Sequence, residues 1–161
     1  MANPLTVMLP IDPSKNVNEL LAELAKNKAE IDAALTSIGT VHFARILFLD
    51  RSNDDLQPTF RPTLPRGKGP FVLGVITEFD GDFDAYIEDF TNKIGVLFDI
   101  ALSYTTDGKS LVPVNSNVQE FLAYLKKHDL SHRPPNNALY NAYDLTVQQI
   151  LCPPESMAQQ A

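Results

Sequence analysis

Two stretches of the chain, residues 41–49 and 71–79, are apolar at nearly every position, and this pattern limits the possible folds most strongly. A strand with one face in water alternates apolar and polar residues, because successive side chains point to opposite faces of the sheet. Near-continuous apolarity therefore predicts two strands in a sheet that is covered on both faces. A chain of 161 residues has little helix with which to cover two faces, so the pattern also suggests that a second subunit supplies part of the cover.

The remaining periodicity predicts a single α+β domain. We expect a strand at 5–11, a helix over 17–37, strands at 41–49 and 71–79, helices over 83–104 and from 118 onward, a weak strand at 138–143 and a short helix at 147–151. The order strand-helix-strand-strand-helix-strand is that of the ferredoxin-like sandwich, here with extra C-terminal helices. In that topology the helices pack on one sheet face, so we expect the second apolar face to meet another copy in a homodimeric α/β barrel.

Capping residues predict several helix boundaries. Asn16 has the chemistry of an N-cap and Gly39 that of a C-terminal stop for the helical region 17–37. Gly95 marks a point where the helix over 83–104 is expected to kink or split. Ser116 and Gln119 have the spacing of a capping box that opens the next helix.

Composition limits the classes of function. A content of 44% hydrophobic residues supports a real core, and we expect one domain over 1–152 followed by a disordered tail at 153–161. The chain has 20 acidic and 13 basic residues, a net charge of −7, which argues against nucleic-acid binding by a basic face. No stretch approaches the ~20 apolar residues of a membrane-spanning helix, and no secretory signal is evident. We therefore expect a cytoplasmic protein without a membrane partner.

The connection over 51–69 is long, proline-rich and basic. Connections of this length are usually functional or mobile. One interpretation is a poorly ordered hairpin loop, and the other is a basic arm that folds over a site or a neighbouring subunit. The sequence leaves both open.

Three stretches, 5–7, 39–45 and 79–90, carry a resemblance to a known family. They resemble bacterial proteins of the dimeric α/β-barrel superfamily, which has a ferredoxin-like fold and is distantly related to the dye-decolourising peroxidases. The resemblance implies the fold, but the superfamily includes cofactor-free and haem-dependent enzymes, so it implies no single activity. The peroxidase signature Gly-x-x-Asp-Gly has Thr77 in place of its first glycine here, with Asp80 and Gly81 at its end. We therefore expect no haem and no other cofactor.

Candidate site residues are polar groups set among apolar ones: His42, Arg45, Glu78, Asp80 and Tyr104. Arg45 needs a partner in an apolar strand, which is either an acid such as Glu78 or Asp80 or an anionic ligand. His42 is either a hydrogen-bonded sheet histidine or a ligand or base. The odd spacing of His42 and Arg45 puts them on opposite faces unless the strand bulges. Asp80 is either a turn or cap residue or a catalytic acid.

Other reactive groups give weaker signals. His128 and His132 have a helical metal-binding spacing, but the second falls in an expected loop, so we expect no metal site. Cys152 lies among apolar and proline residues that would not activate a thiol.

Two functions remain open from the sequence. The first is a barrel that binds a small apolar or aromatic ligand between sheet and helices, with the five candidate residues as polar contacts. The second is a non-catalytic module for dimerisation or for docking to a partner. The sequence assigns no reaction.

Overall fold

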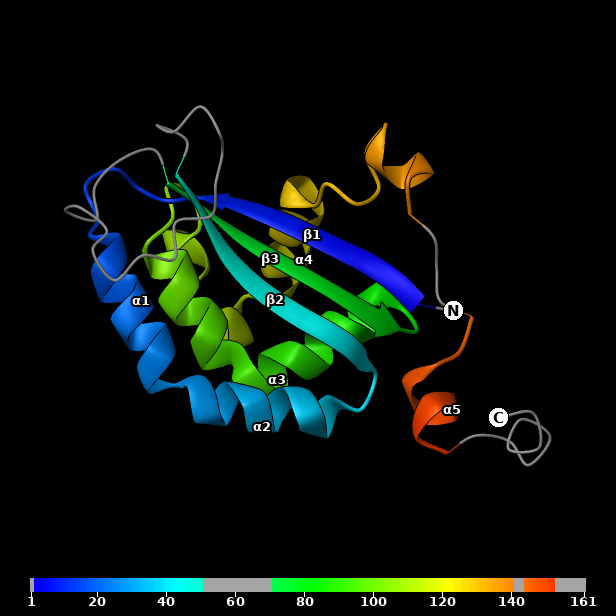
Figure 1. Ribbon diagram of the computed structural model, residues 1–161. Helices are drawn as coiled ribbons and strands as arrows, with labels where there is room; N and C mark the ends of the chain where they lie inside the picture. Colours follow the sequence, from blue (N-terminus) through cyan, green and yellow to red (C-terminus); the bar gives the residue numbers. More distant parts are fainter. Residues whose placement is uncertain (1, 51–70, 141–143, 153–161) are drawn as a thin grey trace.

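The structure is a computed structural model that describes residues 2–50, 71–140 and 144–152 (Figure 1). Its sheet has three antiparallel strands in the order β1-β3-β2, with β1 at Ala2–Pro10, β2 at Val41–Asp50 and β3 at Phe71–Asp80. The predicted strands at 41–49 and 71–79 are confirmed, and the first strand begins three residues earlier than its alternation indicated. Three of the expected segments lie wholly or partly outside the described residues: the connection 51–69, the tail 153–161 and the last three residues of the strand at 138–143.

The helical region after β1 is two helices, α1 (Val17–Lys26) and α2 (Lys28–Ile38), where we predicted one. The interruption is at Asn27, whose side-chain Nδ2 and backbone amide both donate to the carbonyl of Glu23, at 2.8 and 3.2 Å, and so close the end of α1. Asn16 caps α1 by accepting from the amide of Asn18 at 3.0 Å, as expected. Gly39 ends α2 in the left-handed conformation with φ of 71°, which is also as expected.

The third helix, α3, spans Phe83–Ser103 and begins at the N-cap Asp82. The backbone leaves the helical region at Ile94, next to the glycine at which we predicted a kink. Gly95 is also a point of close approach, since a Cβ there would lie 2.4 Å from Oδ1 of Asn115. The interruption of α3 therefore lies where Asn115, on the segment that follows the helix, packs closely against it.

The C-terminal part contains α4 (Val118–His128), α5 (Val147–Leu151) and three short 3-10 helices. The predicted capping box at Ser116 and Gln119 is wrong. Ser116 ends a 3-10 helix at Val114–Ser116, and Asn117 occupies the N-cap position of α4 without a side-chain capping bond. The Asn117 side chain donates instead to the carbonyls of Leu111 and Pro113 in the preceding loop, so it is not free to cap α4. The start of the expected strand at 138–143 is also wrong: Ala138 ends a 3-10 helix.

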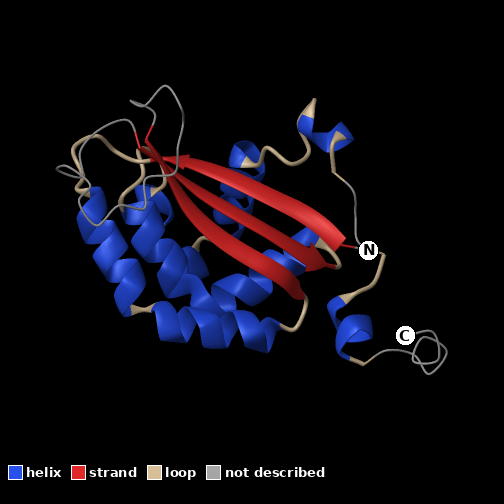
Figure 2. Cartoon of the chain, viewed as in Figure 1, coloured by secondary structure: helices blue, strands red, loops and turns tan. Residues whose placement is uncertain are grey.

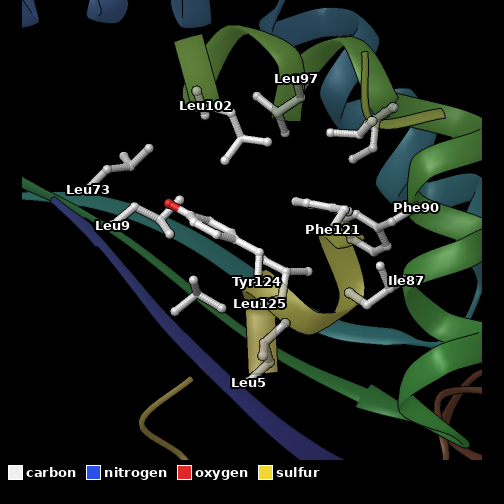
Figure 3. Packing of buried hydrophobic residues seen from close by; sticks show 14 of the residues in the cluster. Leu5, Leu9, Leu73, Ile87, Phe90, Leu97, Leu102, Phe121, Tyr124 and Leu125 are labelled. Atoms are coloured by element: carbon white, nitrogen blue, oxygen red, sulfur yellow. The ribbon is translucent and has the colours of Figure 1, made fainter. Parts of the chain in front are cut away.

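Helices α1 to α4 all pack on one face of the sheet (Figures 1 and 2). Figure 3 shows strand residues such as Leu5, Leu9 and Leu73 directed toward apolar side chains of α3 and α4. On the opposite face, Phe43 is 45% exposed and Arg45 is exposed, whereas Leu47 and Val72 are buried. Among the described residues, no helix covers this second face.

The two edges of the sheet differ. The outer edge of β1 is hydrogen-bonded along its length: Thr6 accepts from the amide of Leu130 at 2.8 Å, Pro10 from that of Thr106, and Ala2 from the hydroxyl of Tyr140. Proline at positions 4 and 10 removes two donors from the same strand. The outer edge of β2 has no strand partner within the described part of the chain.

Candidate functional site

An apolar cavity of about 370 Å³ lies between the sheet and helices α1, α2 and α3. Its floor is the helix-covered face of β2 and β3, and its walls are apolar side chains of the three helices. The cavity opens beside the outer strand, where Ala44 is exposed and Ile46 half-buried. The lining residues are Leu9, Leu21, Leu24, Ala25, Lys28, Ile31, Asp32, Leu35, Ala44, Ile46, Phe48, Leu73, Val75, Thr77, Phe90, Leu97, Phe98 and Ala101.

Among the described lining residues the only charged ones are Lys28 and Asp32, which form an ion pair with each other. They lie four residues apart on α2, and both side chains are more than half exposed, at 72% and 57%. The pair therefore belongs to the outer wall, and its two charges cancel. Such an exposed pair adds little to stability.

The inner wall carries one polar group, the hydroxyl of Thr77, which is only 2% exposed. The hydroxyl of Tyr86 on α3 lies 3.0 Å from it and donates a hydrogen bond to Thr77 Oγ1. Burial raises the pKa of Tyr86 far above its usual value, so this hydroxyl stays protonated. A separate small cavity of about 20 Å³ lies toward Leu5 and Leu125, and Thr77 lines both cavities whereas Tyr86 lines only the small one.

The five residues singled out from the sequence do not line this cavity. Two of them meet at the end of the sheet where β2 starts and β3 stops. His42 is the extra residue of a β-bulge, and its Nε2 lies 3.0 Å from Oδ1 of Asp80. Oδ2 of Asp80 accepts from the amide of Val147 at 2.7 Å, at the start of α5. Asp80 therefore acts in the structure as an anchor for two neighbouring segments, and it is Asp82 that caps α3.

The other three candidates lie apart from this pair. Arg45 is exposed on the uncovered face and makes no ion pair with any described residue, including Glu78. Its register partner is Ile76, and Glu78 is opposite Phe43. From the sequence, His42 and Arg45 should point to opposite faces unless the strand bulges. The strand does bulge at His42, so strict alternation does not hold between these two residues. Tyr104 lies at the end of α3, where its hydroxyl donates to Glu23 at 3.1 Å.

The remaining reactive side chains form no site in the described residues. His128 contacts the carbonyl of Met8 at 3.2 Å, and His132 lies 3.8 Å from Asp129, so the two histidines serve different neighbours. No group of three or more His, Cys, Asp or Glu residues in the described ranges is arranged to hold a metal ion. Cys152 is exposed just after α5. No described helix is both long and apolar enough to cross a membrane.

Thr77, the polar residue of the inner cavity wall, and Tyr86, whose hydroxyl bonds to it, were not identified from the sequence. A signal was present: Thr77 is the one hydroxyl among the inward-facing positions of an otherwise apolar strand. Its partner was hidden, because Tyr86 fits the apolar stripe of α3 and its hydroxyl has no visible role in the sequence.

Comparisons with known proteins give no further information on this site. No family model matches the chain, and neither the curated proteins nor the solved structures include a significant match. The class that the structure itself defines is a small α+β protein, built on a three-stranded antiparallel sheet with helices on one face.

Proposed function

We propose that this protein binds one small apolar or aromatic molecule in the cavity between the sheet and α1, α2 and α3. The observation that supports the proposal is the cavity itself. Its volume of about 370 Å³ lies within the usual range for small-molecule pockets, roughly 300–1,000 Å³. Nearly all its described lining residues are apolar, and a ligand that buries its own apolar surface against them gains free energy.

The proposal is binding and assigns no reaction. The described lining offers one buried hydroxyl, that of Thr77 with its partner Tyr86 behind it, and one exposed ion pair. Neither supplies a general base held next to a nucleophile, the arrangement that acyl or proton transfer would require. The His42–Asp80 pair lies outside the lining.

Binding can be tested with N-phenyl-1-naphthylamine, a neutral dye that fluoresces in apolar surroundings. The Ala25→Phe variant places an aromatic ring at an exposed position that lines the cavity, and we expect it to weaken dye binding about tenfold or more. Ala33→Phe is the matched control, since Ala33 is an exposed alanine of the next helix that does not line the cavity. Equal dye binding by wild type and both variants would contradict the proposal.

For the fold, we propose the ferredoxin-like arrangement. Three observations support it: the order β1-β3-β2, the helical crossover between β1 and β2, and the position of Leu130. The Leu130 amide donates to Thr6 on the outer side of β1, and Val7 and Asp129 form an antiparallel bridge there. This is where a fourth strand of the βαββαβ order would pair.

A second candidate function, a dimerisation or docking module, is supported by the uncovered face of the sheet. Phe43 on this face is 45% exposed, and Met8 and Ile76 on the same face are only half-buried, so an apolar surface remains that contact with another sheet would bury. We propose that two copies pack face to face as a dimeric α/β barrel. Sedimentation at micromolar concentration should then give twice the chain mass.

The matched pair for this test is Phe43→Glu and Val96→Glu. Val96 is a 46% exposed apolar residue of α3, on the helical side of the molecule. We expect Phe43→Glu to give a monomer and Val96→Glu to leave the dimer intact. A monomeric wild type would reject the dimer without affecting the first function.

A further inference from the structure

The Thr77–Tyr86 hydroxyl pair has one hydrogen that no hydrogen bond to a described residue uses. Two hydroxyl groups carry two hydrogens, and a single hydrogen bond of 3.0 Å between them uses one. Within the described residues neither oxygen has a further acceptor in reach. A buried donor without a partner is unfavourable, and folded proteins rarely keep one.

The pair cannot turn away from the cavity to find another acceptor. The Tyr86 ring is stacked on Phe79 with centroids 3.9 Å apart, and its other neighbour Phe90 meets it edge-on at 4.6 Å. Thr77 is fixed on the central strand and is 2% exposed. The unused hydrogen therefore belongs to a rigid inner wall of the cavity.

The charge of the lining bears on the ligand as well. Lys28 and Asp32 neutralise each other on the outer wall, and no other charged side chain lines the cavity among the described residues. A charged ligand would have to leave water without a countercharge at the inner wall, which is unfavourable. The lining therefore favours a neutral ligand with one hydrogen-bond acceptor on an apolar body.

We infer that the ligand is a neutral, mainly apolar carbonyl compound whose oxygen accepts a hydrogen bond from the Thr77–Tyr86 pair. This inference rests on the proposed function, because it names the class of molecule that the same cavity takes. The carbonyl oxygen supplies the missing acceptor, and the rest of the molecule covers the apolar lining. Thr77 is then a residue that determines specificity.

The test compares two probes of nearly equal size, propiophenone and propylbenzene, which differ by a carbonyl in place of a methylene. Displacement of N-phenyl-1-naphthylamine measures the affinity of each. We expect wild type to bind propiophenone between about twofold and tenfold more tightly, the ratio that one neutral hydrogen bond supplies. The ketone is better hydrated than the hydrocarbon, so transfer from water into an apolar cavity alone would favour propylbenzene. Tighter binding of propiophenone would therefore report a specific contact.

Three variants locate the contact. Thr77→Val keeps the shape of the side chain and removes the one hydroxyl of the described cavity lining. The Tyr86 hydroxyl does not line the cavity, so we expect the preference for propiophenone to disappear. Thr77→Ser keeps the hydroxyl and should keep the preference. Thr91→Val is the matched control, because Thr91 is a 1% exposed threonine of α3 that bonds the Glu88 carbonyl and does not line the cavity.

The outcomes separate the two proposals. If both probes bind wild type equally, or if Thr77→Val keeps the preference, the carbonyl inference is wrong and the binding function stands. If neither probe displaces the dye and the dye itself does not bind, the proposed function fails and the inference fails with it. Should Thr77→Val not fold, Thr77→Ser and Tyr86→Phe decide the question. Tyr86→Phe leaves the Thr77 hydroxyl and its unused hydrogen in the cavity wall, so the preference for propiophenone should persist, and its loss in either variant would overturn the inference.

Discussion

His42 and Asp80 are hydrogen-bonded at 3.0 Å, and both side chains are only 11% exposed. The contact joins the second residue of β2 to the last residue of β3, and the second oxygen of Asp80 accepts a hydrogen bond from the start of α5. One carboxylate thus links three segments that are distant in sequence.

We predict that Asp80→Asn lowers the free energy of unfolding by about 1–3 kcal/mol, the range for leaving a buried hydrogen-bonding group without its partner. The amide of Val147 should then exchange with solvent faster, because its acceptor is weakened. Urea unfolding and amide hydrogen exchange measure the two effects. Asp84→Asn is the control: its carboxylate is 53% exposed and pairs with Lys126, so its loss should change stability by less than about 1 kcal/mol.

Ser131 and Thr105 form a natural pair for testing buried hydroxyls. The Ser131 hydroxyl is buried and has no hydrogen-bond partner in the described part of the chain. The Thr105 hydroxyl donates to Leu102 at 2.8 Å and accepts from the Gly108 amide at 3.0 Å. We expect Ser131→Ala to leave the free energy of unfolding unchanged or slightly higher, and Thr105→Val to lower it by about 1–3 kcal/mol. Similar losses of unfolding free energy in both variants would contradict the finding that the Ser131 hydroxyl has no hydrogen-bond partner in the described part of the chain.

Asp107 should make stability depend on pH in the acid range. Burial raises its pKa, but hydrogen bonds from Tyr124 and Lys127 and the nearby His128 outweigh that effect, so the pKa lies below its usual value. A carboxyl group with a lowered pKa stabilises the fold above its unfolded-state pKa, and this contribution disappears as the pH falls through the folded-state pKa.

We therefore expect Asp107→Asn to lower the free energy of unfolding at pH 6. The effect should be smaller at a pH below both the folded-state and the unfolded-state pKa of Asp107. Urea unfolding at pH 6 and at about pH 2 measures the difference. An Asp107→Asn effect of the same size at both pH values would mean that the carboxylate charge has no part in it.

Gly39 tests the left-handed end of α2. A residue with a Cβ at φ of 71° costs roughly 1–2 kcal/mol relative to glycine. Gly39→Ala should lower the free energy of unfolding by about that amount, and Gly39→Asn by less, since asparagine tolerates this conformation. Thermal unfolding of the two variants compares them, and an equal or reversed order would be inconsistent with the geometry.

Local chemistry predicted most of the elements from the sequence. The strands at 41–49 and 71–79, the N-cap Asn16 and the stop at Gly39 depend on patterns within a few residues. The interruption at Asn27 and the role of Asn117 depend on side chains that bond to nearby carbonyls, a choice that periodicity does not reveal.

The candidate site was harder to predict for a physical reason. Charged and polar groups in apolar strands are visible in the sequence, and the fold brings two of them, His42 and Asp80, together. The cavity arises from the spacing between α1, α2 and the outer strand, which leaves Ala44 uncovered. Such a spacing depends on how whole helices rest on the sheet, and no residue pattern encodes it directly.

The difference between the two sheet edges limits how this chain can associate through its strands. Growth of a sheet by strand addition needs an open edge on each side of every copy. The β1 side is already occupied by Leu130, Thr106 and Tyr140, so of the described strands β2 is left to receive another strand. Two copies that join through β2 would each use up this edge. Such pairing ends at two chains and cannot propagate into a filament.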